Sequence, residues 1–511
     1  MVGTATMLSR IFGFIRDVVV AAFYGAAAAT DAFFVAFRIP NLLRRLLGEG
    51  SLTVAFVPVF TEYLTKKSRE EALELANAVF TMLSIILVIV SLLGVLFSPL
   101  IVLAMAPGFA NMPYQFELAV FLTRLMFPYI FFISLVALCM GILNSLRHFA
   151  APALSPVVLN LCMIVATLLL YSFFDEPIVA LAVGVLAGGV LQLAMQWPFL
   201  VKMGVRLKPN FNFRHPGLRQ IGRLLVPTLI GSAVYQINIF VGTILASLLP
   251  KGSVSYLYYA DRIVELPLGV FAIAIGTATL PSLSTLAARG SYEDLKKTLA
   301  FSMRLILFVA VPATVALIML RVPIISVLFQ RGAFGATEAL LTAQALLFYA
   351  VGLWAFSVIR VLDAAFFALQ DRKSPLKAAF VALLVNIVLS IALMFPLKHG
   401  GLALATSIAS AVNVLMLCVI LWHKIGPFLD GAFFRSLVKV FLSSLFMGGA
   451  ISLVGCFLPW NIEGSSYAKT LYLTVSITVG TVVFFSGAFF TRNAELFFFL
   501  DQVKRKITGR R

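Results

Sequence analysis

The chain has 511 residues, of which 61% are hydrophobic and only 12% are charged, and its mean hydropathy is +1.03. Soluble domains carry about 25% charged residues, so this composition excludes a soluble protein and indicates an integral membrane protein. The net charge of +18 at pH 7 sits mostly on loops and on the C-terminal tail, where anionic lipids attract it. We therefore expect no nucleic-acid partner.

Apolar runs separated by polar or proline-containing breaks predict an all-α polytopic fold with fourteen transmembrane helices. In chain order the predicted helices are 3–24, 28–63, 72–105, 116–147, 153–174, 177–203, 217–249, 254–287, 292–320, 337–370, 374–396, 400–423, 433–457 and 467–491. Loops rich in Lys and Arg alternate with loops that contain few of them. Because such residues mark cytoplasmic loops, both termini are expected to be cytoplasmic.

Several break signals recur at a shift of 223 residues or close to it. The matched pairs are Pro58 with Pro281, Pro152 with Pro375, Gly204 with Gly426 and Asn160 with Asn386. The shift spans six helices, an even number, so the two copies have the same orientation. This predicts two parallel six-helix repeats with a site between them. The expected domains are an N-lobe (1–204), a C-lobe (205–426) and a C-terminal pair of helices with a basic tail (427–511).

Eight arginines fall well inside the predicted helices: Arg10, Arg16, Arg38, Arg44, Arg45, Arg124, Arg262 and Arg360. Each costs about 2.5–3.5 kcal/mol at a helix centre unless it faces a wet cavity or a partner. A set of this size is therefore costly unless it serves a site. For Arg124 and Arg360 the sequence leaves a cavity and a structural partner equally open.

Helical spacing groups most of these arginines with acidic or polar residues on shared faces. The groups are Asp31, Arg38 and Arg45 with Glu49; Ser9 with Arg16; Arg10 with Asp17; and Asp261 and Glu265 beside Arg262. Internal salt bridges, such as Arg45 with Glu49 or Arg262 with Glu265, explain part of the set. The first two helices nevertheless hold five Arg against three acidic residues, and this excess favours an anionic ligand. Arginine's planar fork matches phosphate oxygens, so we expect a phosphate-bearing ligand.

Signals for catalysis or metal binding are missing from the sequence. There is no Walker A motif, nucleophile elbow or loop-borne carboxylate pair, and the four histidines lack metal-ligand spacing. The cysteines, which are Cys139, Cys162, Cys418 and Cys456, lie in apolar runs and are expected to be packing residues. We therefore expect no enzyme activity, no cofactor and no metal site.

Two stretches carry a resemblance to a known family. They are "LSRIFGFIRDVVVAAFYGAAAATDAFFVAFRIPNLLRRLLGEGSLTVAFVPVF" and "SVSYLYYADRIVELPLGVFAIAIGTATLPSLS". Both closely resemble the MurJ (MviN) proteins, the lipid II flippases of bacterial peptidoglycan synthesis, and the likeness covers nearly the whole chain. Membership would imply the fold of the MOP exporter superfamily, with a V-shaped central cavity between the two lobes.

The resemblance also implies roles for particular residues. Arg10, Arg16, Arg44 and Arg262 match family arginines that would bind the diphosphate and headgroup of lipid II. A second set is expected to gate the cavity or to position these arginines: Ser9, Asp17, Asp31, Arg45, Glu49, Asp261 and Glu265. The helices at 433–457 and 467–491 would form a groove for the undecaprenyl tail.

The implied function is movement of lipid II from the cytoplasmic to the periplasmic leaflet of the bacterial inner membrane by alternating access. Its expected partners are lipid II, membrane lipids and cell-wall synthesis proteins. Three alternatives stay open: a cation-coupled drug or lipid-linked oligosaccharide exporter of the same superfamily, an enzyme acting on polyprenyl phosphates, and a lipid-binding scaffold. The first of these calls for an acidic or aromatic cavity, which the Arg excess opposes.

The chain departs from the family at the sodium site that some members appear to hold. The polar residues available on the corresponding helices are Gln236, Asn238, Asn386, Ser390 and Thr406. These helices contain no intramembrane Asp or Glu, so a hard cation would lack charge compensation. The sequence therefore argues against sodium binding and leaves the coupling ion open among protons, another gradient and the membrane potential.

Overall fold

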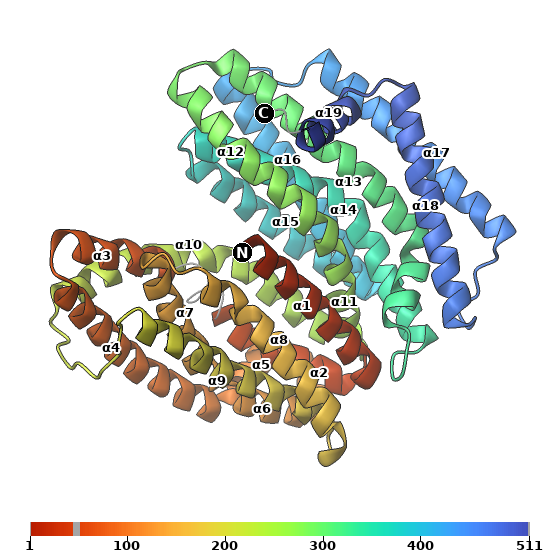
Figure 1. The fold of residues 1–511 in the computed structure, drawn as a ribbon. Coiled ribbons are helices and arrows are strands. Elements are labelled where there is room, and N and C mark those ends of the chain that lie inside the picture. Colours follow the sequence, from red (N-terminus) through yellow and green to blue (C-terminus); the bar gives the residue numbers. More distant parts are fainter. Residues whose placement is uncertain (1, 44–51, 509–511) are drawn as a thin grey trace. The chain divides into compact units, whose positions relative to one another are not determined.

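The computed structural model describes residues 2–43 and 52–508, and every regular element in these two ranges is helical (Figure 1). The chain divides into two compact units. Unit 1 comprises Met1–Ser255 and Arg331–Phe334, and unit 2 comprises Tyr256–Gln330 and Gly335–Arg511. The predicted all-α class is confirmed for the described chain.

The helices of unit 1 are α1 (Val2–Tyr24), α2 (Ala28–Leu43), α3 (Leu52–Lys66), α4 (Arg69–Leu96), α5 (Ser98–Met105), η2 (Pro107–Asn111), α6 (Pro113–Met126), α7 (Tyr129–Ser145), α8 (Ala150–Leu170), η3 (Tyr171–Phe173), α9 (Ile178–Lys202) and α10 (Pro216–Ser247). Helix α8 packs against both α1 and α9, and α3 packs against α7 and α10. A core of buried aromatic and aliphatic side chains, including Phe56, Phe60, Leu75 and Ile142, joins α3, α4 and α7.

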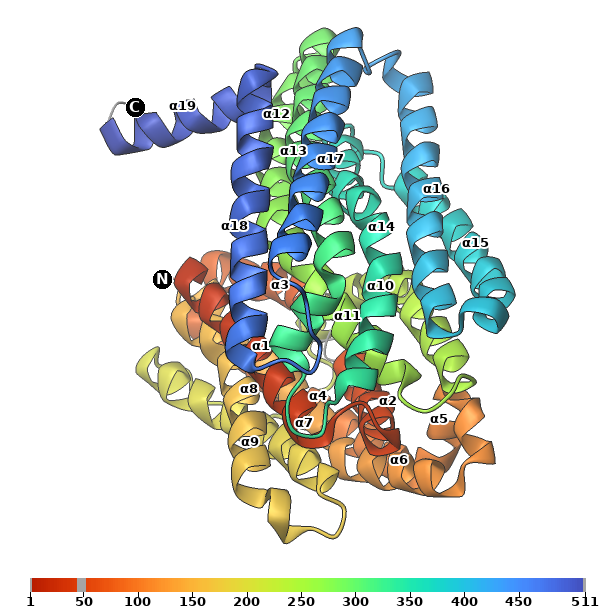
Figure 2. The ribbon, with the colours of Figure 1, turned by 90° about the vertical axis from the view of Figure 1, so that its right-hand side faces the viewer.

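The remaining helices are α11 (Ser253–Pro267), which begins in unit 1, and then η4 (Leu268–Ala272), α12 (Ile273–Ala288), α13 (Tyr292–Phe329), α14 (Ala336–Ala368), α15 (Lys373–Leu397), α16 (His399–Ile425), α17 (Gly431–Phe457), α18 (Ser466–Phe490) and α19 (Ala494–Thr508). Within unit 2, α14 packs against α12, α13 and α16, and α13 also packs against α17 and α18 (Figure 2). Buried side chains such as Leu299, Ile306, Leu362 and Leu417 form its core.

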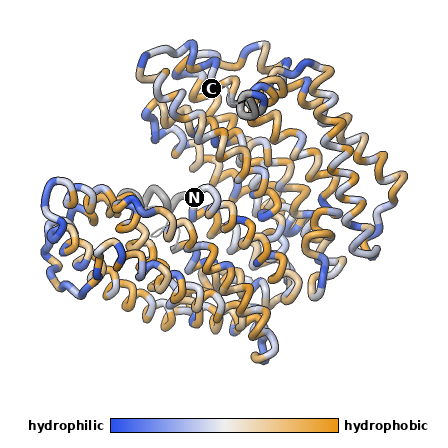
Figure 3. The backbone as a smooth tube through the Cα atoms, in the orientation of Figure 1, coloured by the Kyte–Doolittle hydropathy of each residue, from blue (hydrophilic) through white to orange (hydrophobic). Residues whose placement is uncertain are grey.

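Eleven helical stretches of the described chain are long and apolar enough to cross a membrane. Their outer faces carry large apolar side chains that are mostly exposed: Leu92 is 66% exposed and Phe395 is 77% exposed. The tube in Figure 3 is mostly hydrophobic along the helices, with hydrophilic residues gathered near their ends. Exposed apolar faces of this kind are stable in lipid and costly in water, so this is a multi-pass membrane protein. The number of fourteen spans stays a prediction.

Several predicted helices are broken in the structure. The stretch 72–105 is divided at Phe97, just before a first turn that contains Pro99, and 116–147 is divided at Phe127 and Pro128, where Pro128 is the N-cap of α7. Within 254–287, a π-helical turn follows Pro267, which lacks the N–H that a regular helix needs. The predicted end of the helix 292–320 was wrong, because α13 continues to Phe329.

Positions that match in the predicted duplication have similar local structure. Gly204 (φ 71°) follows the end of α9 and Gly426 (φ 82°) follows the end of α16, and a left-handed residue after a helix favours glycine. Arg147 (φ 61°) precedes α8, and Gln370 (φ 57°), 223 residues later, precedes α15. The parallel arrangement of the repeats stays a prediction, as do the lobes 1–204 and 205–426; by packing, α10 belongs to unit 1.

Close helix contact in unit 2 gives a test of this packing. A Cβ added to Gly352 on α14 would lie 2.5 Å from Ser407 Oγ and 2.8 Å from Ser407 Cα on α16, whereas one added to Gly449 on α17 would meet no atom within 4 Å. Overpacking of a buried contact costs about 1–3 kcal/mol. We expect Gly352→Ala to lower the melting temperature of the detergent-solubilised protein and Gly449→Ala to leave it unchanged or raised. Equal melting temperatures for both variants would contradict the α14–α16 contact.

Candidate functional site

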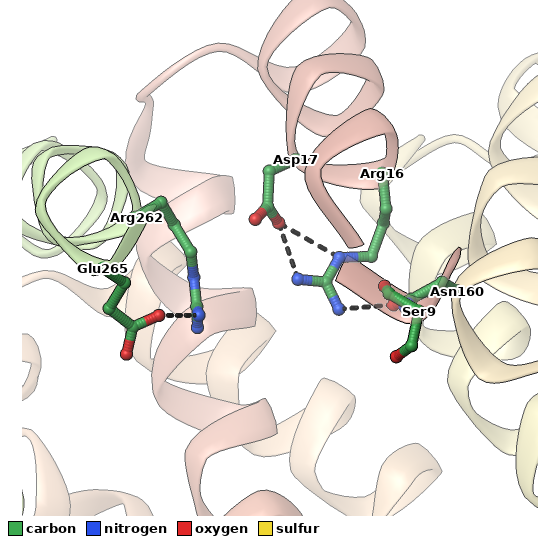
Figure 4. A network of polar contacts seen from close by, with 6 residues as sticks. All are labelled: Ser9, Arg16, Asp17, Asn160, Arg262 and Glu265. Carbon is green, nitrogen blue, oxygen red and sulfur yellow. Dashed lines mark hydrogen bonds and ion pairs between the residues drawn. The ribbon is translucent and has the colours of Figure 1, made fainter. Parts of the chain in front are cut away.

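Arg16 lies at the centre of a polar network inside unit 1 (Figure 4). Its Nε and Nη2 donate to Asp17 Oδ1 at 3.0 and 2.7 Å, and its Nη1 donates to Asn160 Oδ1 on α8 at 3.0 Å. The side chain of Arg16 is 13% exposed and that of Asp17 is 4% exposed. The guanidinium is therefore mostly withdrawn from solvent, compensated by a carboxylate and oriented by an amide.

The face of α1 that carries this network is set by helical spacing. Ser9, Gly13 and Arg16 follow one another at intervals of four and three residues, and the Asn160 amide reaches both ends of this stripe by donating to Ser9 O at 3.3 Å. A Cβ on Gly13 would lie only 3.4 Å from Asn160 Nδ2. The small residue between Ser9 and Arg16 thus lets α8 approach α1 closely enough for one amide to contact both.

Arg10 and Asp17 share a face by the same spacing, but Asp17 accepts from Arg16. The Arg10 side chain is exposed, and within the described part of the chain the structure records no hydrogen bond or ion pair for it. Arg10 lies more than one helical turn from Arg16, and its exposed guanidinium is available to an external anion.

Asp31 holds the start of α11 rather than an arginine. Its carboxylate is 2% exposed and accepts from Gly252 N at 2.6 Å, from Ser255 N at 2.8 Å and from Ser255 Oγ at 2.6 Å. Backbone N–H groups at a helix N-terminus have no partner within the helix, and a carboxylate there is also favoured by the helix dipole. Asp31 therefore fastens α2 to the beginning of α11. Arg38, on the same stripe, is bound to α10 through Thr243 Oγ1 and Ile239 O.

In unit 2, Arg262 is held within α11. Its Nη1 donates to Glu265 Oε2 at 2.5 Å (Figure 4), and its guanidinium carbon lies 4.8 Å from the centre of the Tyr258 ring. The side chain of Arg262 is 27% exposed and that of Glu265 is 46% exposed. Asp261, the neighbouring residue, is exposed. The contact with Tyr258 was not predicted, although its spacing of four residues on a helix is a readable signal.

Three of the expected site residues, Arg44, Arg45 and Glu49, lie outside the described residues. Of the two arginines left open by the sequence, Arg124 donates its Nε to Ser98 Oγ at 2.9 Å, which ties α6 to the start of α5. Arg360 on α14 is exposed. Asp363, which was not predicted as a site residue, is half-buried three residues further along the same helix. The sequence pattern indicates Asn160 only as a repeat position, because a hydrogen bond between helices that are distant in the sequence leaves no local sequence pattern.

No group of three or more His, Cys, Asp or Glu residues that could hold a metal ion lies within the described ranges. Of the polar residues at the family's sodium position, Asn386 and Ser390 are buried in unit 2, where Ser390 Oγ lies 3.3 Å from Asn386 Oδ1. Gln236 is buried in unit 1.

Comparison with solved structures first defines the class. An inward-facing multidrug-resistance MATE transporter of the MOP superfamily matches with a TM-score of 0.66 and 18% identity, covering 82% of this chain and 95% of that one. At this identity the likeness shows the fold alone, so the chain has the same helical fold as that transporter. A solved structure described as lipid II flippase MurJ in an inward closed conformation matches with a TM-score of 0.80 and 30% identity, covering 96% of this chain and 99% of that one.

Sequence comparison then defines the family. The family model described as lipid II flippase MurJ matches residues 20–478. A probable lipid II flippase MurJ from Buchnera aphidicola subsp. Acyrthosiphon pisum is 39% identical over 446 residues, which are 87% of each chain. A lipid II flippase MurJ from Burkholderia cenocepacia is 37% identical over 81% of each chain. The chain belongs to the MurJ family of lipid II flippases.

The role of Asp31 can be tested through stability. Asp31→Ala leaves the N–H groups of Gly252 and Ser255 without their acceptor, and a hydrogen bond to a charged group contributes about 1.5–3 kcal/mol. We expect a clear fall in the melting temperature. Asp175→Ala, which removes a carboxylate from an exposed loop position, is the matched control and should change little. If both variants melt alike, Asp31 does not fasten α2 to α11.

Proposed function

We propose that this protein translocates lipid II, the undecaprenyl-diphosphate-linked peptidoglycan precursor, from the cytoplasmic to the periplasmic leaflet of the bacterial inner membrane. The observation that carries the proposal is membership of the MurJ family, with a family model matching residues 20–478 and a solved MurJ structure covering 96% of the chain. The protein acts as a transporter and not as an enzyme. Lipid II and the surrounding membrane lipids are its partners, with cell-wall synthesis proteins as further candidates.

In this proposal the diphosphate of lipid II is bound by Arg10, Arg16, Arg44 and Arg262. Support comes from chemistry: Arg16 and Arg262 are partly buried in helices of a membrane protein, and each already has a carboxylate beside it. An arginine held in this way keeps its charge and a fixed orientation, which suits bidentate binding of phosphate oxygens. The Asn160 amide fixes the plane of the Arg16 guanidinium.

Transport in this proposal proceeds by alternating access of two parallel repeats, with both termini in the cytoplasm and the polyprenyl tail remaining in lipid against α17 and α18. The alternation of basic loops supports the orientation, and the matched left-handed residues at Gly204 and Gly426 support the duplication. Because the ligand's charge crosses the membrane, the membrane potential can contribute about 2.3 kcal/mol per elementary charge per 100 mV. No sodium dependence is expected.

The test is complementation in bacteria depleted of their own lipid II flippase. The readout is the fraction of lipid II exposed at the periplasmic face, and the wild-type chain should restore it. A wild-type chain that is inserted in the membrane and restores no exposure contradicts the proposed function.

Variants of Arg16 test the site in the same strain. Arg16→Ala should abolish exposure, because both the charge and the planar fork are lost. Arg16→Lys should retain part of it, because the charge remains while the bidentate geometry is gone. Arg124→Ala, which also removes an arginine from an apolar helix but only its bond to Ser98, is the matched control and should restore exposure fully. Full rescue by Ala at each of positions 10, 16, 44 and 262 would contradict the proposed arginine site.

A further inference from the structure

The described chain ends in a helix, α19, where the sequence predicted only a basic tail. Helix α19 begins after a sharp turn at Arg492, whose φ is 49°, and Asn493 Oδ1 accepts from Glu495 N at its first turn. Figure 2 shows α19 turning away from the end of α18 and running across the direction of that membrane helix. A helix that runs across a spanning helix at its end lies along the membrane plane.

A buried ion pair fastens the start of α19 to unit 2. Glu495 is fully buried; one of its carboxylate oxygens lies 3.2 Å from Arg304 Nε on α13, and the other accepts from Ser436 Oγ on α17 at 2.9 Å. Removing a partner of a buried carboxylate is destabilising, because it leaves an uncompensated buried charge. The direction of α19 is thus set by two helices of the bundle and not by the turn alone.

The apolar side of α19 continues the bundle's apolar surface. Leu496 is 5% exposed and belongs to a core formed with α13, α17 and α18, and the Phe499 ring centre lies 6.0 Å from that of Phe308. In the sequence, the apolar residues Leu496, Phe499, Leu500, Val503 and Ile507 recur at helical spacing, a pattern we call the apolar stripe of α19. Leu500 is already 50% exposed, so the cover by the rest of the protein decreases from Leu496 to Leu500.

The charge of the segment changes along its length. Residues 501–511 contain five basic residues and one acidic residue: Lys504, Arg505, Lys506, Arg510 and Arg511 against Asp501. An apolar stripe beside a basic side is typical of helices that lie in the interface of a membrane containing anionic lipid. The alternative partner is an acidic protein surface. Such a surface would match the basic residues but would give no apolar surroundings to the stripe.

We propose that α19 is an interfacial helix whose distal half binds anionic phospholipid headgroups of the leaflet on the side of the C-terminus, with Glu495 as its fixed point. Each basic residue near an anionic surface contributes on the order of fivefold in binding. The inference is independent of lipid II binding, because it concerns bulk phospholipid and none of the proposed diphosphate-binding arginines.

The experiment is hydrogen–deuterium exchange of the full-length protein in nanodiscs of phosphatidylcholine and of phosphatidylcholine mixed with phosphatidylglycerol. The backbone of residues 501–508 should exchange at least about fivefold more slowly in the anionic discs, as expected from one or more basic residues at the surface. This protection should be lost in molar salt, which shortens the screening length. Arg505→Gln combined with Lys506→Gln should remove most of it.

The matched control is Lys373→Gln combined with Lys377→Gln, which removes the same charge from exposed positions near the start of α15. It should leave the protection of residues 501–508 unchanged. A second variant, Glu495→Gln, should weaken protection in the anionic discs by loosening the fixed point. Equal exchange in the two kinds of disc would overturn the proposal, as would protection that survives the change at Arg505 and Lys506 or that the control also removes.

Discussion

The cost of placing arginine in an apolar helix is the constraint that organises unit 1. An uncompensated guanidinium at a helix centre is unfavourable by several kcal/mol, and Arg16 is compensated by Asp17 on its own helix and by Asn160 on α8. The contact with Asn160 requires α1 and α8 to approach closely, and Gly13 provides the space. The buried charge of Arg16 therefore also limits which residues can line the α1–α8 contact.

The same principle applies elsewhere with different partners. Arg262 is compensated by Glu265 and rests on the Tyr258 ring, and Arg304 is paired with the buried Glu495. Asp31, the expected partner of an arginine, instead satisfies backbone N–H groups at the start of α11. Arg262, Asp31 and Glu495 thus each connect two elements or two turns of one element.

Composition and periodicity predicted the membrane class and most helices, because apolar length is a local property. They also placed Ser9 and Arg16 on one face, since helical spacing alone decides it. They did not predict the break at Phe97 or the π turn after Pro267, because proline inside an apolar run is compatible with a continuous or a broken helix. The bond from Arg16 to Asn160 spans 144 residues and depends on packing.

Helix α19 was not predicted from the sequence, for a related reason. Lys and Arg near the C-terminus indicate a cytoplasmic tail, and the helical stripe of Leu496, Phe499 and Val503 is apparent only once the buried Glu495 shows where the helix begins. Family resemblance supplied lipid II as the ligand. Neither charge excess nor spacing could have distinguished a diphosphate from another anion.

The most direct test of the central claim is the affinity of the purified protein for lipid II, measured for wild type and Arg16→Ala by native mass spectrometry at equal lipid concentrations. A lost charge-assisted hydrogen bond is worth about 1.5–3 kcal/mol, so we expect the affinity of Arg16→Ala for lipid II to be at least about tenfold lower, with correctly folded protein in both samples. Equal affinity for lipid II in the two proteins would contradict the role of Arg16 in binding the diphosphate.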